Sequence, residues 1–307
     1  MKKIITLVLM VAMIATFGGC SKKDNADTNP TPTETTDNGT DTTNNETDTT
    51  DNGTDAGATE DLSGTITITG STSVEKILND MIDEFTAYNP DVTINYTGTG
   101  SSAGISDAIA GTNDIGASSR GLKDEEKSSG LKELTFAYDG IAVIVNPANP
   151  VADITLGDLL KIYSGEITNW SELGGNDADI IVVSREGASG TRGAFEELIK
   201  LEDAGGLIED ATVVEGNGNV QTTVAGNANA VGYVSFSFID ETVKALTVEG
   251  VVANADNAKA GTYSLSRPFL FVYQEGKATP VTKAFLEFTT SEEAQEFVAE
   301  HGGIRVD

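Results

Sequence analysis

The chain has 307 residues, of which 48 are acidic and 19 are basic, and its formal net charge is −29 at neutral pH. Nucleic acid and anionic membrane surfaces both repel so acidic a chain, and we expect neither as a partner. One histidine and one cysteine exclude an ordinary Ser-His-Asp triad, an intramolecular disulfide and the usual transition-metal sites, so we expect no cofactor and no metal.

Residues 1–19 have the pattern of a bacterial signal peptide. Two lysines precede an apolar run that is too short for a comfortable membrane span, and Gly18-Gly19-Cys20 follows. This ending resembles a lipobox, in which the chain is cleaved before Cys20 and a lipid is attached to its thiol. A plain secretion signal with an unrelated cysteine is the alternative. We therefore expect an extracytoplasmic protein, attached by lipid to the outer face of the cell membrane through Cys20.

Residues 20–61 contain almost no large apolar side chains. The sequence Thr-Thr-Asp-Asn-Gly-Thr-Asp occurs at 35–41 and again at 49–55. A segment of this composition cannot bury enough surface to offset chain entropy, which predicts a disordered, lipid-anchored linker. Calcium binding by the repeat is an alternative, but the ligand spacing of a calcium loop is missing.

From residue 62 onward, segments with the period of a strand alternate with segments with the period of a helix. We expect strands at 65–69, 92–96, 114–117, 136–145, 180–183, 232–235 and 269–273. We expect helices from Val74 to Phe85, through Ile105–Ile109, and at 156–163, 192–200, 281–288 and 292–301, the first opening with a Thr72/Glu75 capping box. This alternation predicts an α/β fold with mostly parallel sheets flanked by helices.

The turn Ser184-Arg185-Glu186-Gly187-Ala188-Ser189-Gly190-Thr191 follows one expected strand and leads into a helix opening near Thr191. A helix N-terminus offers unpaired N–H groups and a partial positive charge, the hydroxyls donate hydrogen bonds, and the arginine can form a bidentate fork. An ordinary loop with an N-cap is the alternative. Similar Ser/Thr/Gly turns follow three other strands. Ligands of such sheets bind at the carboxyl ends of strands, so the four turns together predict an oxyanion site.

Several of these motifs together resemble one family, the phosphate-binding lipoproteins that act as capture subunits of ABC-type phosphate importers. The resemblance runs from about Gly64 to the C-terminus. Besides the turn at 184–191, it is carried by 70–73 (Gly-Ser-Thr-Ser), 100–102 (Gly-Ser-Ser), 116–118 (Gly-Ala-Ser), 162–170 (Ile-Tyr-Ser-Gly-Glu-Ile-Thr-Asn-Trp), 230–234 (Ala-Val-Gly-Tyr-Val) and 266–268 (Ser-Arg-Pro).

The resemblance implies a type II, two-lobe periplasmic-binding-protein-like fold with the ligand in the interlobe cleft. Lobe 1 would comprise 62–137 plus 262–307, and lobe 2 would comprise 138–261. It also implies a monomer that binds inorganic phosphate and delivers it to an ABC permease. Carried over by position, the phosphate-binding residues would be Thr72, Ser73, Ser101, Ser119, Arg185, Ser189, Gly190 and Thr191.

The chain departs from this family at one position that bears on selectivity. Members often carry an aspartate where Ser119 stands, and that carboxylate accepts the proton of HPO4²⁻ and helps to reject sulfate. We predict that Asp139, in the turn-like Tyr138-Asp139-Gly140, takes this role. The alternative is that Asp139 caps a strand or pairs with an arginine such as Arg185.

Three other functions remain open from the sequence. The site could take another tetrahedral oxyanion, sulfate above all. The chain could be a secreted phosphoester hydrolase with Ser189 or Thr191 as nucleophile, although a histidine base and metal ligands are missing and we do not expect an enzyme. It could also be an adhesin or signalling ectodomain that kept the fold without the ligand.

Overall fold

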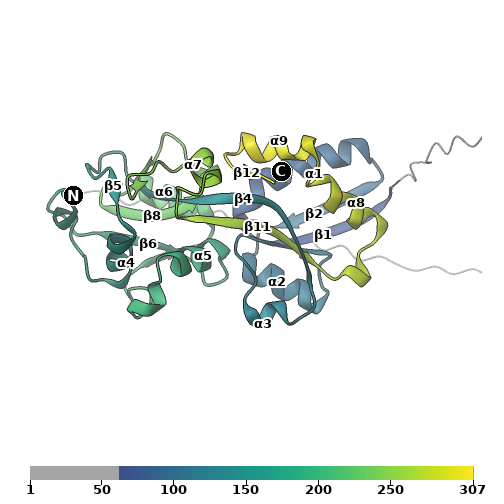
Figure 1. Ribbon diagram of the computed structural model, residues 1–307, viewed down its shortest axis with the longest axis horizontal. Helices are drawn as coiled ribbons and strands as arrows, with labels where there is room; N and C mark the ends of the chain where they lie inside the picture. The colour runs from purple at the N-terminus through teal and green to yellow at the C-terminus, as the bar shows by residue number, and fades with distance from the viewer. Residues whose placement is uncertain (1–61, 307) are drawn as a thin grey trace, which may run out of the picture. The chain divides into compact units, whose positions relative to one another are not determined.

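The computed structural model describes residues 62–306, whose helices and strands are drawn in Figure 1. The expected signal peptide, Cys20 and the linker lie outside these residues. The strands are β1 (Gly64–Gly70), β2 (Val92–Thr97), β3 (Ile115–Ser118), β4 (Lys132–Val145), β5 (Asp153–Ile154), β6 (Ile181–Arg185), β7 (Thr212–Val214), β8 (Ala230–Ser235), β9 (Lys244–Ala245), β10 (Thr247–Val248), β11 (Ser266–Tyr273) and β12 (Ile304–Arg305).

Helices lie between most of these strands. The α-helices are α1 (Glu75–Tyr88), α2 (Ser101–Ala110), α3 (Asp124–Lys127), α4 (Leu156–Ser164), α5 (Gly190–Leu198), α6 (Gly216–Ala225), α7 (Ala255–Lys259), α8 (Pro280–Phe288) and α9 (Glu292–Glu300). Short 3-10 turns are η1 (Thr72–Val74), η2 (Trp170–Leu173), η3 (Leu201–Ala204), η4 (Phe236–Phe238) and η5 (Glu275–Lys277). All the expected strands and helices are present, with ends shifted by a few residues.

The predicted α/β fold is confirmed, but the main sheet is mixed rather than mostly parallel. Its strand order is β2-β1-β3-β11-β4-β8-β6-β7, with β12 and β9 also paired to β4. The outer pairs β1–β2, β1–β3, β6–β7 and β6–β8 are parallel, as strands separated by a helical crossover should be. The middle is antiparallel because β11 runs against both β3 and β4, and β4 runs against β8.

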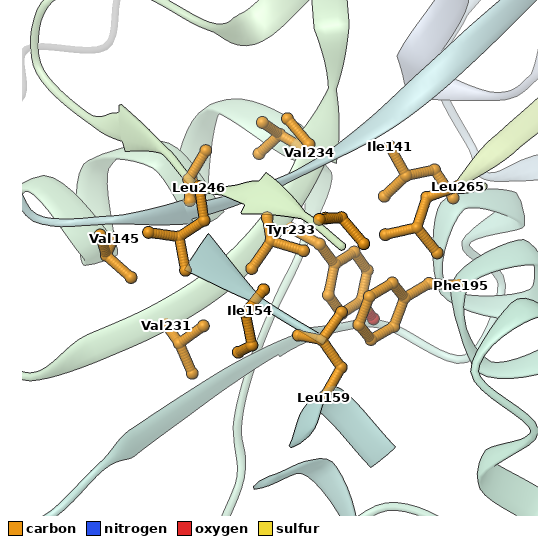
Figure 2. Packing of buried hydrophobic residues seen from close by; sticks show 14 of the residues in the cluster. Ile141, Val145, Ile154, Leu159, Phe195, Val231, Tyr233, Val234, Leu246 and Leu265 are labelled. Atoms are coloured by element: carbon orange, nitrogen blue, oxygen red, sulfur yellow. The ribbon is translucent and has the colours of Figure 1, made fainter. Parts of the chain in front are cut away.

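Buried apolar side chains form two large clusters among the described residues. The first gathers the second half of β4, β6, β8, α4 and α5, and Figure 2 shows part of it. There the Phe195 ring of α5 stacks on the Tyr233 ring of β8, with ring centroids 4.0 Å apart. Each such side chain contributes about 1.5–3 kcal/mol through burial.

The second cluster gathers β1, α1, β11, α8, α9 and the first half of β4. Its centre is Phe136 of β4, which stacks on Phe271 of β11 with ring centroids 4.1 Å apart. The strands β4 and β11 lie side by side over eight register positions and contribute to the second cluster, while β4 continues into the first (Figure 1). The two cores are therefore joined through this antiparallel pair.

Candidate functional site

The turn at 184–191 has the structure that its sequence predicts. β6 ends at Arg185, and α5 begins at Gly190. Ser189 is the N-cap of α5, because its side-chain oxygen accepts a hydrogen bond of 3.2 Å from the Arg192 N–H. Thr191, in the first turn of the helix, is 1% exposed. The hydroxyls and N–H groups of this turn are thus presented by a buried helix start.

The turn that follows β1 meets the α5 turn directly. The Ser73 and Thr191 hydroxyl oxygens lie 2.7 Å apart, and Thr72 Oγ1 accepts a hydrogen bond of 3.1 Å from Arg185 Nη2. The Thr72/Glu75 capping box is wrong: Ser71 provides the side-chain cap, to the Ser73 N–H. The Thr72 side chain bonds to Arg185 instead, across 113 residues of sequence.

Ser101 and Ser119 bring the turns after β2 and β3 to the same place. Ser101 is the first residue of α2; its oxygen lies 3.3 Å from Ser119 Oγ and accepts a hydrogen bond of 3.0 Å from the Ser119 N–H. Gly190 packs against both serines. A Cβ built on Gly190 would lie 2.1 Å from Ser101 Oγ and 2.7 Å from Ser119 Oγ. Only glycine allows so close an approach.

Arg185 is a buried cation, and one of its nitrogens has no partner between residues 62 and 306. Its Nε and Nη2 donate to the Glu186 carboxylate at 2.8 and 2.7 Å, and the side chain is 1% exposed. Its Nη1 is buried and has no hydrogen-bond partner among the described residues. Since an unsatisfied buried donor costs free energy, this atom points to a ligand.

Asp139 pairs with an arginine, and that arginine is Arg267 rather than Arg185. Arg267 Nε and Nη2 donate to Asp139 Oδ2 at 3.1 and 2.8 Å, while Asp139 Oδ1 accepts from the Phe236 N–H at 3.3 Å. Burial raises the pKa of the Asp139 carboxyl, and the Arg267 charge opposes that rise. That Asp139 accepts a proton from the ligand stays a prediction.

Two residues of this region were missed by the sequence analysis as site residues. Arg267 also donates to Ser73 Oγ at 3.2 Å, and Asn217 Nδ2 lies 3.2 Å from the same oxygen. The Ser-Arg-Pro motif at 266–268 could have drawn attention to Arg267. Asn217 had no such signal, because the sequence Gly-Asn-Gly-Asn at 216–219 is typical of a turn, whereas it opens α6.

The structure thus brings the nine predicted residues together. Contacts link seven of them: Thr72, Ser73, Ser101, Ser119, Arg185, Gly190 and Thr191. Ser189 caps the helix that carries Gly190 and Thr191, and Asp139 is joined to Ser73 through Arg267. A cluster of hydroxyls, guanidinium groups and helix starts is suited to an oxyanion.

The structure of residues 62–306 also bears on metal binding and on membrane spans. No group of three or more His, Cys, Asp or Glu side chains in this part of the chain is arranged to hold a metal ion. No helix in the same range is long and apolar enough to cross a membrane.

Comparisons with known proteins agree with this geometry. A family model described as a PBP superfamily domain matches residues 33–293. The chain is 31% identical to the phosphate-binding protein PstS of Bacillus subtilis, covering 98% of this chain and 93% of that protein. It is 30% identical to the protein of that name from Borreliella burgdorferi, covering 79% of this chain and 90% of that one.

Two solved structures of phosphate-binding transport proteins are also similar to this chain. One is a putative phosphate ABC transporter substrate-binding protein with bound phosphate from Clostridium perfringens, with 47% identity and a TM-score of 0.78 over 80% of this chain and all of that one. The other is an ABC-type phosphate transport receptor from Vibrio cholerae, with 39% identity and a TM-score of 0.68 over 79% of this chain and all of that one. The chain therefore belongs to the PBP superfamily and, within it, to the PstS family of phosphate-binding proteins.

Proposed function

We propose that this protein captures inorganic phosphate outside the cytoplasm and delivers it to the permease of an ABC importer. The observation that carries the proposal is the buried donor cluster around Ser73 and Thr191, in which the Nη1 atoms of Arg185 and Arg267 have no partner among the described residues. The names of the PstS relatives and the phosphate in the Clostridium perfringens structure support it.

The energetics of the cluster are adequate for tight binding without a cofactor. A hydrogen bond to a charged group contributes about 1.5–3 kcal/mol net. Three to five such bonds supply the roughly −8 kcal/mol of a micromolar site. Since the chain is strongly acidic, long-range attraction does not help, and screening beyond about 8 Å at physiological salt weakens it in any case. Short, desolvated contacts therefore provide the affinity.

Phosphate in this site bridges groups from elements that pack into different apolar clusters. Ser101, Ser119 and Ser73 are carried by elements around β1 and β3, whereas Arg185 and Thr191 are carried by β6 and α5. In our proposal these are lobe 1 (62–137 plus 262–307) and lobe 2 (138–261). Because the ligand contacts both, it favours the closed state by its differential contacts, and closure signals the loaded state to the permease.

Calorimetry with phosphate, sulfate and arsenate tests the choice of ligand. We expect phosphate and arsenate to bind and sulfate to bind more weakly, because only the first two can donate a proton to an acceptor in the site, for which the serine and threonine hydroxyl oxygens suffice. Tight sulfate binding with no phosphate binding would replace the proposal with a sulfate carrier. Turnover of a generic phosphoester by the purified protein would favour the hydrolase instead.

The same proposal includes attachment to the membrane through a lipid on Cys20, with 20–61 as a linker that lets a monomeric binding domain reach the permease. The lipobox-like Gly18-Gly19-Cys20 supports it. We expect Cys20→Ser to release the protein from the membrane fraction into the medium, with phosphate binding unchanged. Continued sedimentation of the variant with membranes would contradict lipid attachment.

A further inference from the structure

Arg267 is held next to the hydroxyl cluster by strand register. It lies on β11 directly opposite Asp139 of β4 in the antiparallel ladder. The ion pair between them is buried, with side chains that are 2% and 1% exposed. Because both backbones are fixed by the sheet, the guanidinium group has little freedom to turn away.

The Arg267 guanidinium group also contacts the hydroxyl cluster. Nη2 also donates to Ser73 Oγ at 3.2 Å, and Ser73 in turn contacts Thr191. Nη1 is buried without a hydrogen-bond partner among the described residues, as is Nη1 of Arg185. A buried ion pair kept only for structure would be expected to satisfy all its donors.

The two arginines also act on each other electrostatically. Burial lowers the pKa of Arg267, Asp139 opposes this effect, and the Arg185 charge adds to it. Two buried cations that interact in this way repel each other, and an anion that accepts from both relieves the repulsion. Glu186 neutralises the far side of Arg185, just as Asp139 neutralises one edge of Arg267.

We propose that Arg267 is a second guanidinium group that binds the phosphate, together with Arg185, and that Asp139 positions Arg267 instead of contacting the ligand. This inference rests on the proposed function, since it concerns the same site. The phosphate oxygens then accept from Nη1 of each arginine, while the Nη2 atoms donate to the adjacent residues Thr72 and Ser73.

Calorimetry on the Arg267→Lys variant tests the proposal that Arg267 binds the phosphate. Lysine keeps the charge but cannot bond to Asp139 and to an anion through a rigid fork. We expect phosphate affinity to fall about 10- to 100-fold, the change produced by losing one charged hydrogen bond. Arg305→Lys is the control and should bind like the unmutated protein, because Arg305 lies on β12, which pairs with β4, and its side chain pairs with Glu296 of α9 at 2.8 Å.

The outcomes separate the two proposals. If the unmutated protein does not bind phosphate, the proposed function fails. If it binds and Arg267→Lys binds equally well, only the role of Arg267 is overturned. Should Arg267→Lys not fold, a crystal structure of the unmutated protein with phosphate decides. We expect an Arg267 Nη1–oxygen distance of about 3 Å, and a distance beyond about 4 Å would refute the contact.

The ratio of phosphate to sulfate affinity in Asp139→Asn tests the proposal that Asp139 positions Arg267 without contacting the ligand. If Asp139 only positions Arg267, both affinities change together and the ratio stays within about threefold, because Arg267 does not distinguish the two oxyanions. If Asp139 accepts the phosphate proton, the ratio collapses as sulfate affinity rises relative to phosphate. That result would overturn the positioning role.

Discussion

Replacing Gly190 with alanine tests the arrangement of the site most directly. The added methyl carbon would lie 2.1 Å from Ser101 Oγ, 2.7 Å from Ser101 Cβ and 2.7 Å from Ser119 Oγ. The hydroxyls can rotate away, but Ser101 Cβ can move only with α2. Since carbon atoms need about 3.5 Å or more, α5 and α2 must separate by about 1 Å.

A separation of that size breaks the bonds between the two sides. The 2.7 Å contact between Ser73 and Thr191 would exceed the hydrogen-bonding range, and so would the 3.1 Å bond from the Ser102 N–H to the Ala188 carbonyl. Phosphate would then reach only one side. Losing two charged hydrogen bonds costs about 3 kcal/mol or more, which is at least about a 100-fold loss of affinity.

The assay is calorimetry with phosphate, with urea unfolding as a check on stability. We expect the free energy of unfolding without phosphate to fall by about 1–3 kcal/mol, the usual cost of an extra methyl group in a packed site, because α5 carries Phe195 of the first core and must move. Gly187→Ala is the matched control in the same turn, since nothing lies within 4 Å of a Cβ built there. Phosphate affinity of Gly190→Ala within threefold of the unmutated protein would refute the reasoning, because the close approach would then be irrelevant to binding.

Three further outcomes follow from the structure. In Arg185→Lys, the lysine cannot bond to the Glu186 carboxylate and to a ligand at the same time, so phosphate affinity measured by calorimetry should fall about 10- to 100-fold. Unchanged affinity would exclude Arg185 from the site. Burial raises the pKa of Tyr233 to about 12, above the value of about 10 in the unfolded chain. The stability that the neutral Tyr233 side chain contributes is therefore fully present below about pH 10 and is lost between about pH 10 and 12. Urea unfolding should show a loss of at least about 2–3 kcal/mol across that range, since burial also raises the pKa values of Tyr96, Tyr163 and Tyr263, and a flat profile would contradict it. Phe136→Ala should lower the free energy of unfolding in urea by about 3–5 kcal/mol, against under about 0.5 kcal/mol for Tyr88→Ala, since Tyr88 is 67% exposed. Equal effects of the two substitutions would contradict the place of Phe136 in a core.

Local patterns were enough to predict much of the fold. The strand at 65–69 and the helix of α1 follow from alternation and from apolar spacing, which depend only on neighbouring residues. The Ser189 cap and the start of α5 follow from the same local chemistry. The capping box at Thr72 failed because a distant arginine binds that hydroxyl, and no local pattern contains this competitor.

The antiparallel centre of the sheet was not predictable in the same way. A helix between two strands indicates a parallel pair, which holds for β1, β2 and β3. The pairing of β11 with β4 joins Ser266–Tyr273 to residues more than a hundred positions earlier, and nothing in either strand alone specifies its partner. The location of Arg267 in the site depends on this pairing.

The sequence by itself determined the kind of chemistry: small hydroxyl-rich turns after strands, a glycine at 190, and an arginine at 185 suited to an oxyanion. Only the tertiary structure decided which groups face each other. It paired Arg267 with Asp139 over 128 residues and brought Asn217 to Ser73 over 144. The physical reason is that turn and helix signals act between neighbours, whereas a binding site is assembled by sheet register and core packing, which act between residues far apart in the chain.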